Sequence, residues 1–268
     1  MTLKNERSGI QQTMQDSLFR LDGQVALITG CRRGIGLAMA DALAEAGADI
    51  IGISASLNPE SSEVGDAIRK RGRRFCGYRC DLSDRQDVDQ VLEEILSQHS
   101  AIDVLVNNAG IVQRSPAEDH SDAIWDMVLE VNLSAVFRVS RRIGTLMLER
   151  GRGSIISTAS ILSDQGGLNV ASYAASKAGL ANLTRSLANE WAGRGVRVNA
   201  IAPGYVKTEM TEALQSDPLR SRQILERIPA GRFGSPDDLR GPVVFLASEA
   251  SRYVHGETLV VDGGWMGR

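Results

Sequence analysis

The sequence predicts an α/β fold in one domain, with a doubly wound parallel sheet of about seven strands and helices on both faces. Short segments that are apolar on both faces alternate with longer amphipathic segments from residue 23 onward, as in βαβ units. No segment repeats at a fixed period, and no linker divides the chain. The 268 residues are 43% hydrophobic, which suits one sizeable core. We therefore expect residues 21–268 to form a single domain.

Seven segments qualify as strands, because each is short, rich in apolar or β-branched residues and set apart from the next by a helical pattern or a loop. In chain order they are residues 25–29, 49–54, 74–79, 104–107, 154–158, 197–201 and 258–261. The helical patterns are residues 36–46, 60–71, 85–97, 123–150, 172–193 and 236–247. Strands connected through helices in this way lie parallel, with right-handed crossovers.

Two segments depart from this alternation. Residues 208–232 are a polar, helix-forming insert that follows Pro203 and Gly204, and they predict a lid. Residues 1–20 are polar and lack the apolar core of a signal peptide. We expect these 20 residues to be a flexible N-terminal extension, or a segment that packs on a neighbouring subunit.

The composition favours neither a nucleic-acid nor a membrane partner. The 30 basic and 33 acidic residues leave a net charge of −3, and no apolar run approaches the roughly 20 residues that span a bilayer. A basic run at residues 69–74 ends a helical pattern, and we interpret it as a solvated face. The three cysteines and three histidines have no metal-ligand spacing, so we expect no metal and a reducing, cytoplasmic location.

A glycine-rich turn joins the first predicted strand to the first predicted helix. Glycines let a backbone turn tightly and approach a pyrophosphate, and a helix N-terminus offers free N–H groups to it. An ordinary strand–helix loop is the alternative interpretation, but the position of the turn favours a Rossmann-like dinucleotide site. The turn reads Gly30, Cys31, Arg32, Arg33, Gly34, Ile35 and Gly36.

Tyr173 and Lys177 are four residues apart on a strongly helical segment, so they share one face. A nearby ammonium lowers the pKa of a tyrosine, which suits the phenol for proton exchange with an alcohol or ketone. Such a pair is more often a solvated helix face. Here it follows Ser160, which comes shortly after a predicted strand at the edge of the sheet where ligands bind in open α/β folds.

The glycine spacing, with three residues and then one between successive glycines, resembles that of the short-chain dehydrogenase/reductase family. Further family motifs follow in the expected order, from about residue 21 to the C-terminus. The resemblance implies an oxidoreductase that uses NAD or NADP to interconvert alcohols and ketones. The motif residues are Asp81, Leu82, Asn107, Asn108, Ala109, Gly110, Asn132, Ser160, Tyr173, Lys177, Pro203, Gly204 and Thr208.

The resemblance also implies cofactor contacts. Asp81 and Leu82 are expected to hold the adenine ring. Asn107 is expected near the adenosine ribose, with Ala109 and Gly110 also at the cofactor. Contacts to the nicotinamide carboxamide are expected from Pro203, Gly204, Val206 and Thr208.

The choice between NAD and NADP depends on the end of the second predicted strand. An acidic residue there would bind the ribose 2′-hydroxyl and exclude a 2′-phosphate, but this chain has Ser54. Arg32 and Arg33 in the glycine-rich turn carry guanidinium groups that suit phosphate. We expect NADP to be accepted at least as well as NAD.

The family resemblance implies the remaining catalytic roles. Ser160 would hydrogen-bond the substrate oxygen, and Lys177 would hold the nicotinamide ribose and assist Tyr173. Asn132 would anchor a water molecule that relays protons to Lys177.

Segments outside the shared motifs resemble the sugar-acid dehydrogenases of that family, including residues 189–192, 227–234 and 261–265. A sugar acid needs a cation for its carboxylate and polar groups for its hydroxyls. Arg114 is our candidate carboxylate ligand, with a surface arginine as the alternative, and Gln165 and Asn169 are candidate hydroxyl ligands. Two other functions stay open: reduction of a 3-oxoacyl thioester, and nucleotide binding without catalysis. The resemblance also implies a homotetramer or homodimer.

Overall fold

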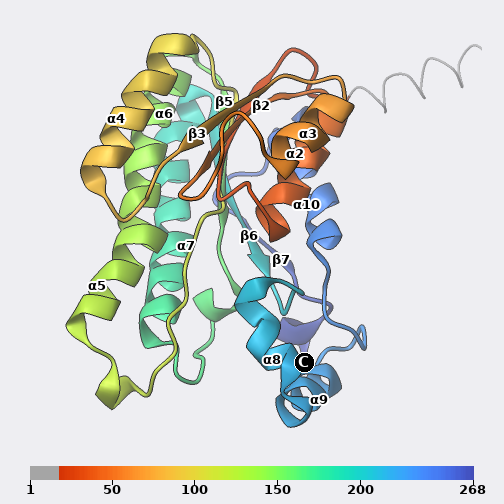
Figure 1. The fold of residues 1–268 in the computed structure, drawn as a ribbon. Helices are drawn as coiled ribbons and strands as arrows, with labels where there is room; N and C mark the ends of the chain where they lie inside the picture. The colour runs from red at the N-terminus through yellow and green to blue at the C-terminus, as the bar shows by residue number, and fades with distance from the viewer. Residues whose placement is uncertain (1–17) are drawn as a thin grey trace, which may run out of the picture.

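The computed structural model describes residues 18–268, so most of the predicted N-terminal extension lies outside the described residues. Seven parallel strands form one sheet in the order β3-β2-β1-β4-β5-β6-β7 (Figure 1). This architecture confirms the predicted fold class. The strands are β1 Val25–Thr29, β2 Asp49–Ser54, β3 Phe75–Arg79, β4 Val104–Asn107, β5 Gly153–Thr158, β6 Val196–Pro203 and β7 Thr258–Val261.

Helices cover both faces of the sheet because both faces are apolar. One core cluster joins the sheet to α2, α3 and α10, and a second joins it to α4, α6 and α7. Figure 1 shows these two sets of helices on opposite sides of the strands. The helices are α2 Gly34–Ala46, α3 Glu63–Lys70, α4 Arg85–Gln98, α5 Asp122–Leu129, α6 Ala135–Arg150, α7 Ala171–Trp191, α8 Glu212–Ser216, α9 Pro218–Arg227 and α10 Arg240–Ala247.

Local capping moves several predicted boundaries by a few residues. Helix α3 starts at Glu63 rather than at residue 60, because the side chain of Ser62 accepts a hydrogen bond from the Gly65 N–H and caps the helix. The predicted helix at 236–247 begins as a 3-10 turn, and only its second part is α10. Strand β6 runs on to Pro203, which pairs with Val261 of β7.

The predicted helix at 123–150 contains a π-helical turn, Glu130–Ser134, between α5 and α6. Asn132 lies in this turn and is completely buried. Such turns are rare and occur often at functional sites, because they redirect a side chain within a continuous helix.

The insert after β6 does form helices. Figure 1 shows α8 and α9 as a pair beyond the ends of β6 and β7. The apolar side of the insert packs against the C-terminal segment, since Ile224 and Ile228 lie in one cluster with Phe233 and Trp265. The guanidinium of Arg227 lies 3.8 Å from the centre of the Trp265 ring. The insert at residues 208–232, which we continue to call the lid although that role stays a prediction, is therefore attached to the domain through its second helix.

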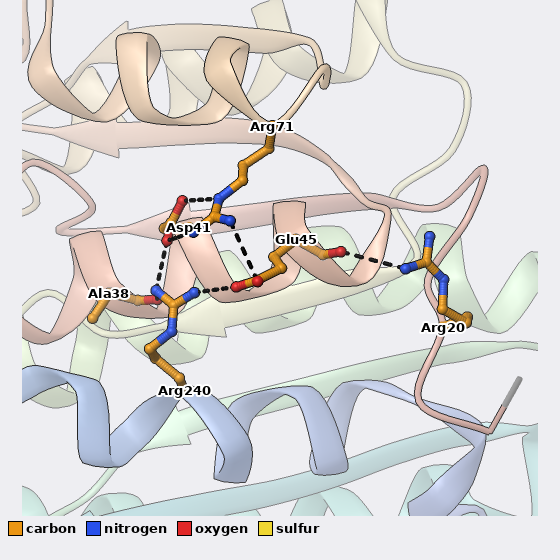
Figure 2. A network of polar contacts seen from close by, with 6 residues as sticks. All are labelled: Arg20, Ala38, Asp41, Glu45, Arg71 and Arg240. Carbon is orange, nitrogen blue, oxygen red and sulfur yellow. Dashed lines mark hydrogen bonds and ion pairs between the residues drawn. The ribbon is translucent and has the colours of Figure 1, made fainter. Parts of the chain in front are cut away.

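The outer surface of α2 carries a network of arginines and carboxylates (Figure 2). Asp41 accepts hydrogen bonds from Arg71, at the end of α3, and from Arg240, at the start of α10. Glu45 forms ion pairs with the same two arginines. The predicted basic run thus lies on the surface at a helix end, where its arginines pair with carboxylates. Within residues 18–268, no helix is long and apolar enough to cross a bilayer.

Candidate active site

A cavity of about 600 Å³ opens at the carboxyl ends of the strands, beneath the lid. It is bounded by the turns after β1 to β6 and by the first part of the lid. Ligands bind at this edge in open α/β folds, where the strand order reverses. The predicted site residues that line it are Gly30, Arg32, Arg33, Gly34, Ile35, Gly36, Ser54, Asp81, Leu82, Ala109, Gly110, Arg114, Ser160, Tyr173, Lys177, Pro203, Gly204, Val206 and Thr208.

The glycine-rich turn is shaped by close backbone contacts. A Cβ atom on Gly30 would lie 2.8 Å from the Ala109 Cα, and one on Gly36 would lie 2.1 Å from the Gly30 carbonyl oxygen. Gly30 and Gly34 also have φ angles of 67° and 57°, in the left-handed region. Larger residues at Gly30 and Gly36 would push apart the turn and the loop after β4, whereas at Gly34 the backbone angle is the constraint.

This turn and the start of α2 fit the pyrophosphate of a dinucleotide. Arg33 occupies the N-cap position of α2 without a side-chain hydrogen bond to the helix, so the first N–H groups stay available to a ligand. The cavity extends from there past Ser54 and Asp81 to Pro203. The residues predicted for the adenosine and nicotinamide ends of a dinucleotide therefore line one cavity, and their contacts with a cofactor stay predictions.

Asn107 does not line this cavity. It is 2% exposed, and its Nδ2 donates to the Ser140 hydroxyl at 2.9 Å inside the core. The neighbouring Asn108 lines the cavity instead, and its Nδ2 donates to the carbonyl oxygens of Thr29 and Gly30. Asn108 thereby ties the loop after β4 to the glycine-rich turn, and the direct cofactor contact predicted for Asn107 stays a prediction.

Tyr173, Lys177 and Ser160 meet in the cavity as the sequence spacing suggests. Tyr173 is half-buried, and the Ser160 side chain is close enough to lower the pKa of its phenol. The Lys177 Nζ lies 5.7 Å from the centre of the Tyr173 ring and donates to the Thr158 carbonyl oxygen at 2.6 Å. That carbonyl ends β5, so the sheet fixes the position of the ammonium group.

The pKa of Tyr173 is shifted in the opposite direction to the one expected from its pairing with Lys177. Burial raises the pKa of the Tyr173 phenol, while the Ser160 side chain and the charge of Arg114 oppose that rise. Burial also lowers the pKa of Lys177 to about 8. The lowered phenol pKa that we expected from Lys177 is therefore not produced by the protein's own groups, because desolvation is the larger effect.

Asn132 lies behind the cavity wall and connects three elements. Its Oδ1 accepts from the Ile111 N–H at 2.8 Å, and its Nδ2 donates to the Ile111 carbonyl oxygen and the Ser176 hydroxyl. A Cβ on Gly110 would lie 3.2 Å from this Oδ1 and 3.5 Å from the Lys177 Nζ. The amide is thus close to Lys177, but its two ends are already hydrogen-bonded to protein groups.

The three predicted substrate residues lie in different surroundings. Arg114 lines the cavity, and its Nη2 donates to the Met210 carbonyl oxygen at 3.4 Å. Gln165 accepts a hydrogen bond from the Trp265 indole at the C-terminus and does not line the cavity. Asn169 is exposed, has a φ of 59° and accepts a backbone hydrogen bond from Ser115. Contacts of Gln165 and Asn169 with a substrate stay predictions.

Several residues that line the cavity, most of them at the start of the lid, were not among the site residues predicted from the sequence. Glu209, Met210 and Leu214 line it, as does Tyr205, whose ring packs against Trp265. Only their proximity in the chain to Thr208, which Tyr205 precedes and the other three follow, could have indicated them. Among residues 18–268, no group of three or more histidine, cysteine, aspartate or glutamate side chains is arranged to hold a metal ion.

A family model described as enoyl-(acyl carrier protein) reductase matches residues 30–266. The chain belongs to the short-chain dehydrogenase/reductase family. It is 56% identical to the 2-dehydro-3-deoxy-D-gluconate 5-dehydrogenase of Pseudoalteromonas atlantica, over 93% of this chain and 98% of that protein. It is 40% identical to the 3-oxoacyl-(acyl-carrier-protein) reductase FabG of Escherichia coli, over 91% and 97%.

Solved structures of this family superpose closely on the chain. A putative NAD(P)-dependent gluconate 5-dehydrogenase from Beutenbergia cavernae, with bound NADP, has a TM-score of 0.90 at 49% identity and covers 94% of this chain and 100% of its own. A gluconate 5-dehydrogenase from Burkholderia cenocepacia, in complex with NADP and tartrate, has a TM-score of 0.90 at 40% identity, covering 95% and 99%. The chain is therefore an oxidoreductase of this family.

Proposed function

We propose that the protein interconverts a secondary hydroxyl and a ketone on a sugar acid of the gluconate, 2-deoxygluconate or keto-deoxygluconate type. NADP is accepted as cofactor at least as well as NAD. The observation that carries the substrate class is the place of Arg114, whose guanidinium faces the cavity near Tyr173.

A cation beside the proton-transfer group favours an anionic substrate. The charge of Arg114 acts on the Tyr173 phenol, so the two groups are near enough to contact one small molecule. A carboxylate on Arg114 would hold the substrate while its reacting carbon lies above Tyr173. The sugar-acid activity of the Pseudoalteromonas relative and the tartrate in the Burkholderia structure, itself a hydroxy acid, support this class.

The cofactor choice is supported by the adenosine end of the cavity. Ser54 offers a hydroxyl where a carboxylate would exclude a 2′-phosphate, and Arg32 and Arg33 line the same region. Relatives from Beutenbergia and Burkholderia were both solved with NADP. Comparing kcat/KM for NADP and NAD tests this choice, and a large preference for NAD would contradict it.

The glycine-rich turn and Lys177 would hold the NADP or NAD cofactor, which when bound would supply hydride transfer at the substrate carbon. During oxidation the Tyr173 phenolate accepts the hydroxyl proton of the substrate, and during reduction the phenol returns it. The Ser160 hydroxyl hydrogen-bonds the same substrate oxygen and stabilises its negative charge. Lys177, held by the Thr158 carbonyl, would orient the cofactor ribose, and a water molecule anchored at Asn132 would relay protons to Lys177.

Turnover on a substrate panel tests the proposal most directly. Hexonates, 2-deoxyhexonates and ketohexonates should give a change in nicotinamide absorbance, whereas the matching neutral polyols should react far more slowly. An acetoacetyl thioester tests the second candidate function, which is favoured by the similarity to FabG. Faster turnover of the thioester would replace our proposal, and cofactor binding without turnover of any substrate would indicate a non-catalytic nucleotide-binding protein.

We also propose that the protein works in the cytoplasm as a homotetramer or homodimer. Helices α6 and α7 present a shallow groove lined by Leu133, Phe137, Gly179 and Leu183, which would pair with the same face of a second copy. Phe137 is 40% exposed in the single chain, which such pairing would cover. Sedimentation or light scattering gives the number of subunits.

A further inference from the structure

Arg33 already has a partner in the structure. This arginine of the glycine-rich turn forms an ion pair with Glu209, at the start of the lid, and both residues line the cavity. The two side chains are 58% and 61% exposed. Within residues 18–268, Arg33 forms no ion pair with another carboxylate.

We propose that Glu209 is a specificity-determining residue for the cofactor, because its carboxylate competes with a 2′-phosphate for the guanidinium of Arg33. This inference rests on the proposed use of NADP, in which Arg33 binds the phosphate. It assigns a role to a lid residue that the family motifs do not include.

Local geometry holds Glu209 beside the turn. The Thr211 hydroxyl accepts a hydrogen bond from the Thr208 N–H at 3.1 Å and donates to the Val206 carbonyl oxygen at 2.6 Å, which fixes the backbone of the 3-10 turn that carries Glu209. A Cβ on Gly34, the residue after Arg33, would lie 3.5 Å from the Thr208 Cγ2. The backbones of the lid and of the glycine-rich turn therefore lie side by side. This placement brings Glu209 within reach of Arg33.

The competition follows from charge. An exposed ion pair contributes about 1 kcal/mol or less, because water screens it. A phosphate monoester carries about −1.5 to −2 charges and binds a guanidinium through two hydrogen bonds, so it can displace the carboxylate. Glu209 then stays nearby as a repelling charge. NAD has a hydroxyl at this place and leaves the pair intact, so Glu209 weakens the binding of NADP relative to NAD.

Equilibrium binding of NADP and NAD to the full-length protein, measured by titration calorimetry without substrate, tests the proposal. Glu209→Gln removes the charge and keeps the shape. We expect it to lower the Kd of NADP about three- to tenfold, on the scale of an exposed charge pair, and to change that of NAD less than twofold. Glu212→Gln is the matched control, because Glu212 is also on the lid but does not line the cavity. It should leave the ratio of the two Kd values unchanged.

A double variant separates competition for Arg33 from general repulsion. If Glu209 acts through Arg33, Glu209→Gln should bring little further gain in NADP affinity when Arg33 is already replaced in Arg33→Gln. An unchanged Kd ratio in Glu209→Gln would overturn the proposal. So would equal weakening of both cofactors, since the pair would then only close the lid. These readouts need no sugar acid, so a failed substrate assignment leaves them interpretable.

Discussion

Two regions on and around α2 use the same chemistry in different ways. On its outer surface, the Asp41 side chain is 16% exposed and is shared by Arg71 and Arg240, which link α2 to the end of α3 and to α10. At its N-terminus, Arg33 and Glu209 are more than half exposed and form a single pair between turn and lid. The Asp41 carboxylate therefore has two arginine partners and is largely shielded from water. The Arg33–Glu209 pair is exposed, and within the described part of the chain each of its side chains has one charged partner.

The difference indicates which charged side chains stabilise the fold and which are available to bind a ligand. A carboxylate that several elements share loses all its partners at once when it is replaced, so the fold depends on it. A charge at the cavity with one exposed partner can exchange that partner for a ligand at little cost. We therefore expect changes at the α2 surface to lower stability with little effect on activity, and changes in the cavity to do the reverse.

The largest effect on the cavity side is expected for Tyr173→Phe. Loss of the proton-transfer group should lower kcat by about a hundred- to ten-thousandfold. The melting temperature and the Kd of the cofactor should change little, because the ring and its packing remain. Tyr253→Phe, at a side chain that is 96% exposed, is the control. Near-normal turnover of Tyr173→Phe would refute the assignment.

The counterpart on the α2 surface is Asp41→Asn. It should lower the free energy of unfolding by about 1.5–3 kcal/mol, since charge-assisted hydrogen bonds from two arginines are weakened together. The activity of the folded enzyme should be unchanged. Asp66→Asn is the matched control, because within residues 18–268 the only ion pair of Asp66 is with Arg69 on an exposed face, and its effect should stay within about 0.5 kcal/mol. Denaturant unfolding measures both.

The contribution of Asp41 to the free energy of unfolding should depend on pH. Arg71, and then Arg240, lowers the pKa of Asp41 against the opposing effect of burial. The stabilisation is then fully present above the unfolded pKa of about 3.9 and is lost as the pH falls through the lower folded value. The stability difference between wild type and Asp41→Asn should therefore shrink in acid. A difference that is constant with pH would exclude the ionised network as its source.

Next in size is Arg114→Ala, which separates substrate binding from chemistry. It should raise KM for acidic substrates about tenfold or more, as expected for a lost hydrogen-bonded charge, and change KM for neutral polyols little. Arg222→Ala is the control, because Arg222 is an exposed lid arginine paired with Glu226 and away from the cavity. Equal effects on both substrate types would reject the carboxylate role.

The smallest effect is a shift in the pH profile of the same variant. In the proposed mechanism alcohol oxidation needs the Tyr173 phenolate, and burial raises the pKa of this phenol, so oxidation should increase into the alkaline range. The positive charge of Arg114 opposes that rise. Arg114→Ala should therefore move the profile of kcat/KM to higher pH, while Arg222→Ala should not. A profile that stays in place would show that Arg114 acts on binding alone.

The sequence was sufficient to predict the parallel sheet, because each strand is indicated by a short apolar run of neighbouring residues. Apolar runs such as residues 104–107 can be buried only between two helix layers, and the glycines at 30, 34 and 36 permit only a narrow range of turns. The placement of Tyr173, Lys177 and Ser160 in one cavity also followed from spacing, since the pair shares a helix face and the serine comes shortly after β5.

Other features depend on contacts between distant segments. The π-helical turn at Asn132, the burial of Asn107 and the pairing of Gln165 with Trp265 each need a partner that sequence spacing does not reveal. The rise in the pKa of Tyr173 is of the same kind, because desolvation comes from the whole surrounding structure rather than from one neighbour.

By itself, therefore, the sequence determined the parallel sheet and was sufficient to predict the dinucleotide turn and the catalytic groups, since these depend mainly on local patterns and motifs. Only the tertiary structure decided which charges are available at the cavity. Arg71 and Arg33 look alike in the sequence. One is held in a network with Asp41 and Glu45 and the other meets a lid residue far along the chain, because folding sets the partners and the solvent exposure of each guanidinium.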